Sequence, residues 1–495
     1  MTQAPENRPM IRTLPETHTV LVVGALVGCA TVATPANAQS DAIDRTVMPA
    51  AQEAPEVDFP NIERRTLSNG LNVWIVERSG IPLVTVRLVL DAGAITDPGP
   101  LTGRASLTAE MLTEGTSNRS ATQIADEVEF LAANLNAGAG RETAAVTLGT
   151  LSRNLEPALD LFADVIRNPA FAQEDWDRVQ DQRLVSLLQS LDQPTVLAGQ
   201  EFSRTVYGDE HPYGRRVEGT PETVERITSD DLRAFHAEYY RPEDGNLTVV
   251  GDVEADRVVG LLEEAFGGWQ GAPPGRAAPP SAPAAQPRTQ IFLLDKPGAA
   301  QSEVRIGHVG VDRANEDYFP LQVLNALLGG QFTSRINLNL REDKGYTYGA
   351  SSAFQMGRIA GPFVASGGVQ TAVTKESILE FMRELEEIQT SRPATDEEVE
   401  FARTSIIRQE PLTLETNAQI AGRLQELIVY GLPLDYFDEY TERFAEVTTA
   451  DVNRVAREYL RPDAFAIVVV GDRSVIEEGL RTLPYPVEIV AIEAP

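Results

Sequence analysis

The chain has 495 residues, of which 42% are hydrophobic and 23% are charged, so it is long and apolar enough to build a large core. It carries 42 Lys and Arg against 73 Asp and Glu, a formal net charge of −31. Nucleic acids and anionic membranes select basic faces, so this balance argues against both as partners. The four histidines, at positions 18, 211, 236 and 308, are too far apart in sequence to form a helical metal-binding pair.

The first 38 residues have the pattern of a secretory signal peptide. Two arginines precede an apolar run at 20–33, and Ala36-Asn37-Ala38 forms an A-x-A cleavage site. We therefore expect export to the periplasm. Because Leu26-Val27-Gly28-Cys29 resembles a lipobox, an outer-membrane lipoprotein anchored at Cys29 is the alternative, and it would give the protein a membrane contact. Residues 39–58 are acidic and rich in Pro and Ala, which predicts a disordered spacer.

The elements of the next segment alternate between strand and helix patterns. Residues 65–77 predict a hairpin that turns at Asn69-Gly70, and 83–90 alternate as a half-buried strand does. Helical spacing of apolar residues follows at 121–133 and 154–167. Strands interspersed with helices on one side predict an α+β unit with a mainly antiparallel sheet and helices packed on one face.

An internal repeat divides the chain. Residues 238–252 match 458–472, and 227–232 match 447–452, both at an offset of 220. Each copy predicts a Thr-capped helix that ends at Arg-Pro, followed by a buried strand closed by Gly-Asp. We therefore predict two homologous halves, 59–270 and 289–495, joined by a Pro/Ala-rich linker at 271–288.

An ordered series of motifs resembles the insulinase or pitrilysin type of zinc peptidase, which includes the mitochondrial processing peptidase subunits. The resemblance covers about residues 59–490 and implies that each half is part of a clamshell peptidase. The motifs are Leu67-Ser-Asn-Gly-Leu71, Asp91-Ala-Gly-Ala94, Met111-Leu-Thr-Glu-Gly-Thr116, Asn168-Pro-Ala-Phe171, His211-Pro-Tyr-Gly214 and Tyr239-Tyr-Arg-Pro242.

In that family the helix before the Met-Leu motif carries the zinc motif H-x-x-E-H. The resemblance places Ser106 and Glu110 at the two His positions, Ala109 at the catalytic Glu, and Gln189 near the third ligand. Serine and glutamine are poor zinc ligands, and alanine cannot accept a proton. We therefore expect that this chain binds no metal or other cofactor, has no catalytic residue of its own and is inactive alone, with zinc in a partner subunit.

The second half carries Arg341 and Tyr348 in a segment that resembles the one reaching the substrate beside the zinc. A guanidinium and a phenol can both donate hydrogen bonds to a peptide carbonyl and to the oxyanion that develops on it. The resemblance implies substrate binding and support of the transition state in trans. The alternative is a surface Arg341 paired with Glu342 or Asp343, and a half-buried Tyr348.

These features predict a non-catalytic, substrate-binding subunit of an exported heterodimeric zinc metallopeptidase. Its partners would be a zinc-bearing homologous subunit and peptide substrates, held partly by strand addition to a sheet edge in the zinc subunit. Two alternatives remain at this point. One is a peptidase-derived binding or scaffold protein without a role in catalysis, and the other is an independent enzyme with an unusual metal site.

Overall fold

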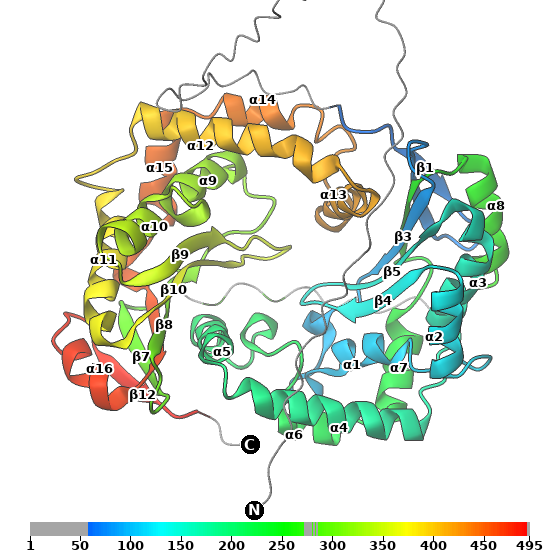
Figure 1. Ribbon diagram of the computed structural model, residues 1–495, viewed down its shortest axis with the longest axis horizontal. Helices are drawn as coiled ribbons and strands as arrows, with labels where there is room; N and C mark the ends of the chain where they lie inside the picture. Colours follow the sequence, from blue (N-terminus) through cyan, green and yellow to red (C-terminus); the bar gives the residue numbers. More distant parts are fainter. Residues whose placement is uncertain (1–57, 272–279, 281–282, 284–285, 493–495) are drawn as a thin grey trace, which may run out of the picture. The chain divides into compact units, whose positions relative to one another are not determined.

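A computed structural model describes residues 58–271, 280, 283 and 286–492 (Figure 1). The predicted signal peptide, nearly all of the spacer and much of the linker lie outside the described residues. Among the helices that are described, none combines the length and the apolar character needed to cross a membrane.

The first half builds a six-stranded sheet in the order β1-β2-β6-β3-β5-β4 (Figure 1). All neighbours are antiparallel except β2 and β6. The predicted hairpin is confirmed, because Thr66 pairs with Asn72 across a turn in which Gly70 has a φ of +90°. The strands are β1 (Glu63–Thr66), β2 (Asn72–Glu77), β3 (Leu83–Leu90), β4 (Asn134–Ala139), β5 (Ala144–Leu151) and β6 (Asn246–Gly251).

The second half builds an equivalent sheet in the order β12-β7-β11-β8-β10-β9. It differs at its outer strand, because β12 comes from the C-terminal segment and runs parallel to β7, whereas β1 precedes β2 and runs antiparallel to it. The strands are β7 (Gln290–Asp295), β8 (Gln301–Val309), β9 (Thr347–Phe354), β10 (Pro362–Gln370), β11 (Ala466–Gly471) and β12 (Val487–Val490).

Strand register and helix caps agree with the repeat in the sequence. Val86 of β3 pairs with Val249 of β6, and Val304 of β8 pairs with Val469 of β11, so β6 and β11 keep the offset of 220 while β3 and β8 are offset by 218. The helices α7 (Ser229–Tyr239) and α15 (Thr449–Tyr459) begin at equivalent capping boxes. In each, the Thr side chain accepts the backbone N–H of the Asp three residues later, and the Asp side chain accepts the backbone N–H of the Thr. The two halves therefore have the same α+β architecture.

The remaining helices follow the apolar spacing of the sequence, with one shortened end. The predicted helix at 121–133 ends at Phe130, because Ala132 has a φ of +47° and a left-handed residue cannot continue a helix. The helices are α1 (Arg104–Met111), α2 (Ala121–Phe130), α3 (Leu155–Arg167), α4 (Gln173–Ser190), α6 (Pro221–Arg226), α8 (Ala255–Phe266), α9 (Tyr318–Asn325), α10 (Arg335–Asn337), α11 (Thr374–Glu387), α12 (Asp396–Gln409), α14 (Tyr440–Ala445) and α16 (Arg473–Leu480).

One helix of each half packs on the sheet of the other half. Helix α5 (Pro194–Tyr207) contacts β8 and β11, and its equivalent α13 (Asn417–Tyr430) contacts β3 and β6 (Figure 1). Phe202 of α5 shares a core with Val468 and Val470 of β11. Both faces of the central strands are therefore covered, which explains why β11 is buried throughout and β6 is buried from Leu247 to Gly251, instead of alternating.

Candidate functional site

Helix α1, which the resemblance identifies with the zinc helix, is fixed at its N-terminus by a buried carboxylate. Asp97 accepts the N–H groups of Gly103 at 3.0 Å and Ala105 at 3.1 Å. Burial raises the pKa of the Asp97 carboxyl to about 7. Gly103 has a φ of +102°, and a Cβ there would lie 3.0 Å from the Glu218 carbonyl oxygen. Helix α1 is therefore held tightly against the segment around Glu218.

The structure brings Ser106 and Glu110 together on one guanidinium. Arg183 of α4 donates from Nη2 to Ser106 Oγ at 3.2 Å and to Glu110 Oε2 at 2.5 Å, and from Nη1 to the Glu218 carbonyl at 3.0 Å. The Arg183 side chain is 12% exposed, and Ala109 is fully buried. The polar groups that α1 presents at these positions therefore face a positive charge.

Gln189 does not join this group. It is exposed near the end of α4, and among the described residues no hydrogen bond links its side chain to Ser106 or Glu110. Sequence reasoning missed Arg183, because the register of one helix against another is not readable from local spacing. Arg183 lies in Gln182-Arg-Leu-Val185, six residues before Gln189. The only sequence signal for its role was a positive charge close to the expected third ligand.

These residues do not fit a zinc ion. A hydroxyl, a methyl group and a single carboxylate already paired with arginine lack the imidazole or thiolate donors that zinc prefers. In the part of the chain that the structure describes, no group of three or more His, Cys, Asp and Glu side chains is placed to hold a metal.

The three described histidines lie in different parts of the fold. His211 accepts the Tyr213 N–H on Nδ1 at 3.0 Å and caps the short 3-10 turn Pro212–Gly214. His236 donates to the Ile166 carbonyl, and His308 donates to the Val309 carbonyl. Burial lowers the pKa of both His236 and His308 to about 4, so both are neutral at pH 7.

Arg341 lies beside an exposed aromatic ring. Its guanidinium carbon is 4.4 Å from the centre of the Phe332 ring, and its Nε is 3.2 Å from Glu342 Oε1. The pairing with Glu342 was the surface alternative, whereas the stacking on Phe332 was not predicted. A ring below the guanidinium restricts its plane, so Arg341 is oriented as well as charge-paired.

Tyr348 is 88% exposed, so it is not the half-buried strand residue of the alternative interpretation. It lies on β9, the edge strand, where a register shift marks a β-bulge. Thr347 pairs with Val369 and Ala350 with Gly367, so Tyr348 and Gly349 together oppose Gly368. Bulges change the direction of a side chain and are common beside active sites.

The segment that leads to and includes Arg341 contains two π-helical turns, Ala326–Gly330 and Leu338–Asp343, which flank the short α10. The sequence predicts a glycine break and then a regular helix with Ile336, Leu338 and Leu340. The regular part covers three residues, and Leu338 is 39% exposed while the other two are buried. A Cβ on Gly329 would lie 2.4 Å from the Ser352 nitrogen, so this glycine allows close packing on β9.

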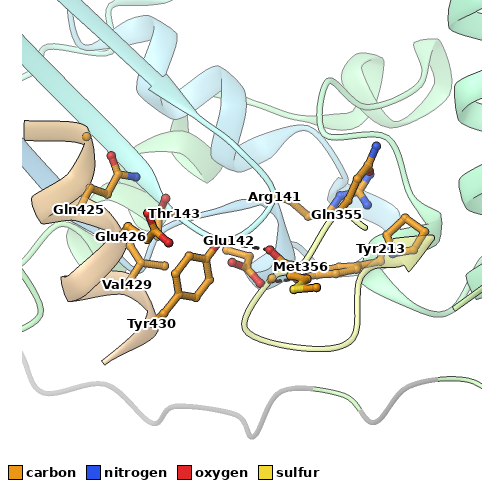
Figure 2. A pocket seen from close by; sticks show the side chains of 13 residues that line it. Arg141, Glu142, Thr143, Tyr213, Gln355, Met356, Gln425, Glu426, Val429 and Tyr430 are labelled. Atoms are coloured by element: carbon orange, nitrogen blue, oxygen red, sulfur yellow. Dashed lines mark hydrogen bonds between the residues drawn. The ribbon is translucent and has the colours of Figure 1, made fainter. Parts of the chain in front are cut away.

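A cavity of about 460 Å³ lies where the β4–β5 turn, the β9–β10 loop and α13 meet (Figure 2). Beside it, Glu142 accepts hydrogen bonds from the Tyr213 hydroxyl and from the Arg358 N–H at 2.7 Å. The Arg358 guanidinium pairs with Asp91 at 2.5 Å. Figure 2 shows the side chains of Glu142 and Tyr213 directed toward one another beside the cavity. The β9–β10 loop, which continues the strand of Tyr348, is thus held by residues of the first half.

The protein has a duplicated α+β fold. Its first half carries α1 at the place of the zinc helix, and its second half carries the segment with Arg341 and the exposed Tyr348. This combination is typical of a peptidase-like class of protein. The family pattern "Insulinase (Peptidase family M16)" matches residues 73–207, and "Peptidase M16 inactive domain" matches residues 226–406. Together they span more than half of the chain, which belongs to the insulinase/pitrilysin family of metallopeptidases.

Relatives and solved structures agree with this assignment. An uncharacterized zinc protease of Mycobacterium leprae (strain TN) is 29% identical over 440 residues, which are 86% of this chain and 94% of the relative. One from Streptomyces coelicolor is 27% identical over 420 residues, 83% and 90% of the two chains. The structure described as a peptidase M16 inactive domain from Pseudomonas fluorescens has a TM-score of 0.77 at 28% identity, with 83% of this chain and 98% of that chain covered. A protease from Helicobacter pylori has the same fold, with a TM-score of 0.75, 22% identity, and 83% and 99% coverage.

Proposed function

We propose that this chain is the non-catalytic, substrate-binding subunit of an exported heterodimeric zinc peptidase. The observation that carries the proposal is Tyr348, which a β-bulge presents almost fully exposed on an edge strand while a guanidinium stands at the zinc helix of the same chain. The exposed Tyr348 hydroxyl can donate to a bound peptide, whereas the donor set at Ser106 and Glu110 cannot support metal chemistry.

The proposed contribution is positioning and charge stabilisation. The zinc of the partner subunit would activate water and polarise the peptide carbonyl. The Tyr348 hydroxyl and the Arg341 guanidinium donate to that carbonyl, and their hydrogen bonds strengthen as negative charge develops on its oxygen. The peptide itself adds as a strand to a sheet edge of the zinc subunit, where backbone hydrogen bonds hold it without regard to sequence.

The test is peptide cleavage by this chain assembled with a zinc-bearing homologue from the same genome. We expect Arg341→Ala and Tyr348→Phe each to lower kcat by about a hundredfold to a thousandfold, the usual cost of one oxyanion donor, while assembly is unchanged. Arg383→Ala is the matched control, because Arg383 is similarly exposed and paired with Glu380 but lies on α11. An unchanged rate in an assembled complex would refute a role in trans and leave a scaffold function. Failure of every homologue to bind would refute the heterodimer itself.

Export is a separate part of the proposal, and it rests on the signal pattern of residues 1–38. We expect the mature protein to begin at Gln39 and to be recovered from the periplasm. Intact mass measurement checks this, since cleavage and lipidation at Cys29 would leave ten more residues and a diacylglyceryl group. A mature chain that retains residues 1–38 in the cytoplasm would contradict export without affecting the proposed role in trans.

A further inference from the structure

Three oxygen atoms from separate segments converge on one guanidinium in the first half. The Ser106 hydroxyl and the Glu110 carboxylate lie one turn apart on α1, the Glu218 carbonyl comes from the segment before α6, and Arg183 projects from α4. Residues at i and i+4 share a face of a helix, so both side chains of α1 address the same point. A single cation therefore joins two helices and a loop.

The guanidinium has properties that a divalent ion at this point would lack. Its planar fork donates to several oxygens at once, in directions fixed by the geometry of the group. Its side chain is 12% exposed and needs no loading step. Because Glu110 already balances its charge, a second cation beside it meets repulsion from Arg183 and has no unpaired carboxylate to bind.

The duplication supplies an internal comparison. Arg403 of α12 lies 220 positions after Arg183 and donates to the Ala445 and Val447 carbonyls at the end of α14. In the first half, Gln180 donates to two carbonyls at the equivalent helix end, those of Val224 and of Ile227, which is the counterpart of Val447. Arg183 is thus not needed for the contact its counterpart makes, and it turns to α1.

We infer that Arg183 replaces the metal ion as the cation that joins α1 to α4, so that this site is stable without a metal and excludes one. The residues involved belong to this chain alone, and the inference does not depend on a partner subunit. It predicts that histidines introduced at positions 106 and 110 of α1 do not restore tight zinc binding while Arg183 is present. It also predicts that Arg183 contributes to stability in a way that chelators and added zinc do not change.

The first test measures zinc retained after dialysis by the full mature chain. S106H/E110H keeps Arg183 and is expected to bind zinc at least a hundredfold more weakly than S106H/E110H/R183E, which is expected to retain about one equivalent because it offers two imidazoles and a carboxylate. One equivalent in the double variant would overturn the exclusion. A folded triple variant with no zinc would overturn the placement of Arg183 at the metal position.

The second test measures thermal unfolding and decides the matter if the triple variant fails to fold. Arg183→Gln is expected to lower the midpoint temperature of unfolding clearly more than Arg178→Gln does. Arg178 is the matched control on α4, because its side chain is 43% exposed and pairs with Glu114. Neither chelator nor zinc is expected to shift the wild-type midpoint. Equal effects of the two substitutions, or a chelator-sensitive midpoint, would overturn the inference.

Discussion

The bonds of Glu142 to the β9–β10 loop give the sharpest quantitative prediction. Its carboxylate accepts from the Tyr213 hydroxyl and the Arg358 N–H, and Tyr213 is 3% exposed. Burial and the nearby carboxylate raise the pKa of Tyr213 well above its usual range, so the phenol remains a donor throughout the working pH range. Glu142→Ala removes both bonds and leaves a buried hydroxyl unpaired.

The cost follows from ordinary magnitudes. A hydrogen bond to a charged group contributes about 1.5–3 kcal/mol, and an unpaired buried donor costs about 1–3 kcal/mol. Because water can enter the adjacent cavity of about 460 Å³ and rehydrate part of the site, we expect a net loss of about 2–4 kcal/mol in the free energy of local opening. This corresponds to exchange of loop amides that is faster by about thirtyfold to several hundredfold.

Hydrogen–deuterium exchange of residues 355–361 is the assay. Glu129→Ala is the control, because Glu129 is an exposed glutamate on α2 whose side chain makes no hydrogen bond with a described residue. Protection of the loop should be unchanged in the control and reduced in Glu142→Ala, with the β9 amides that lead to Tyr348 affected next. Exchange within threefold of wild type in Glu142→Ala would show that the loop is held by other contacts.

Three further predictions concern single positions. Gly357→Ala should loosen the same loop, because its Cβ would lie 2.6 Å from Tyr213 Oη, and unchanged loop exchange would contradict this. Thr448→Ala should lower the free energy of unfolding by about 0.5–2 kcal/mol through loss of the α15 cap, measured by urea denaturation; no change would argue against the capping box. Burial raises the pKa of Asp97 to about 7, so its contribution to stability is present below about pH 4 and lost as pH rises through 7. Unfolding free energies at pH 4.5, 6 and 8 should therefore show the wild type losing stability relative to Asp97→Asn, and a constant difference would contradict the shift.

The local elements of the fold were predictable from the sequence. The strand at 83–90 and the Thr caps of α7 and α15 depend on spacing and capping over a few residues, which periodicity reports directly. The repeat supports these predictions, because the helix, its cap and the central strand of one half predict their counterparts in the other half. The family resemblance rests on the same local motifs and is confirmed.

The long-range placements were not predictable in the same way. The pattern of α5 indicates an amphipathic helix but cannot say that the sheet it covers belongs to the other half. The bulge at Tyr348 depends on how many residues β10 places opposite β9. The position of Arg183 depends on the register between α1 and α4. Each of these is a relation between distant segments, and local spacing carries no information about it.

Equivalent arginines in the two halves make different contacts. Position 183 and its repeat, 403, are both arginine, yet one joins α1 to α4 and the other holds the end of α14. In the first half Gln180 holds the Val224 and Ile227 carbonyls at the end of α6, and we expect that this leaves Arg183 available to α1. If this reasoning is right, Gln180→Ala should draw Arg183 toward the freed carbonyls and weaken its bonds to Ser106 and Glu110. The structure of that variant distinguishes this outcome from an Arg183 that stays in place, which would mean that α1 alone determines its position.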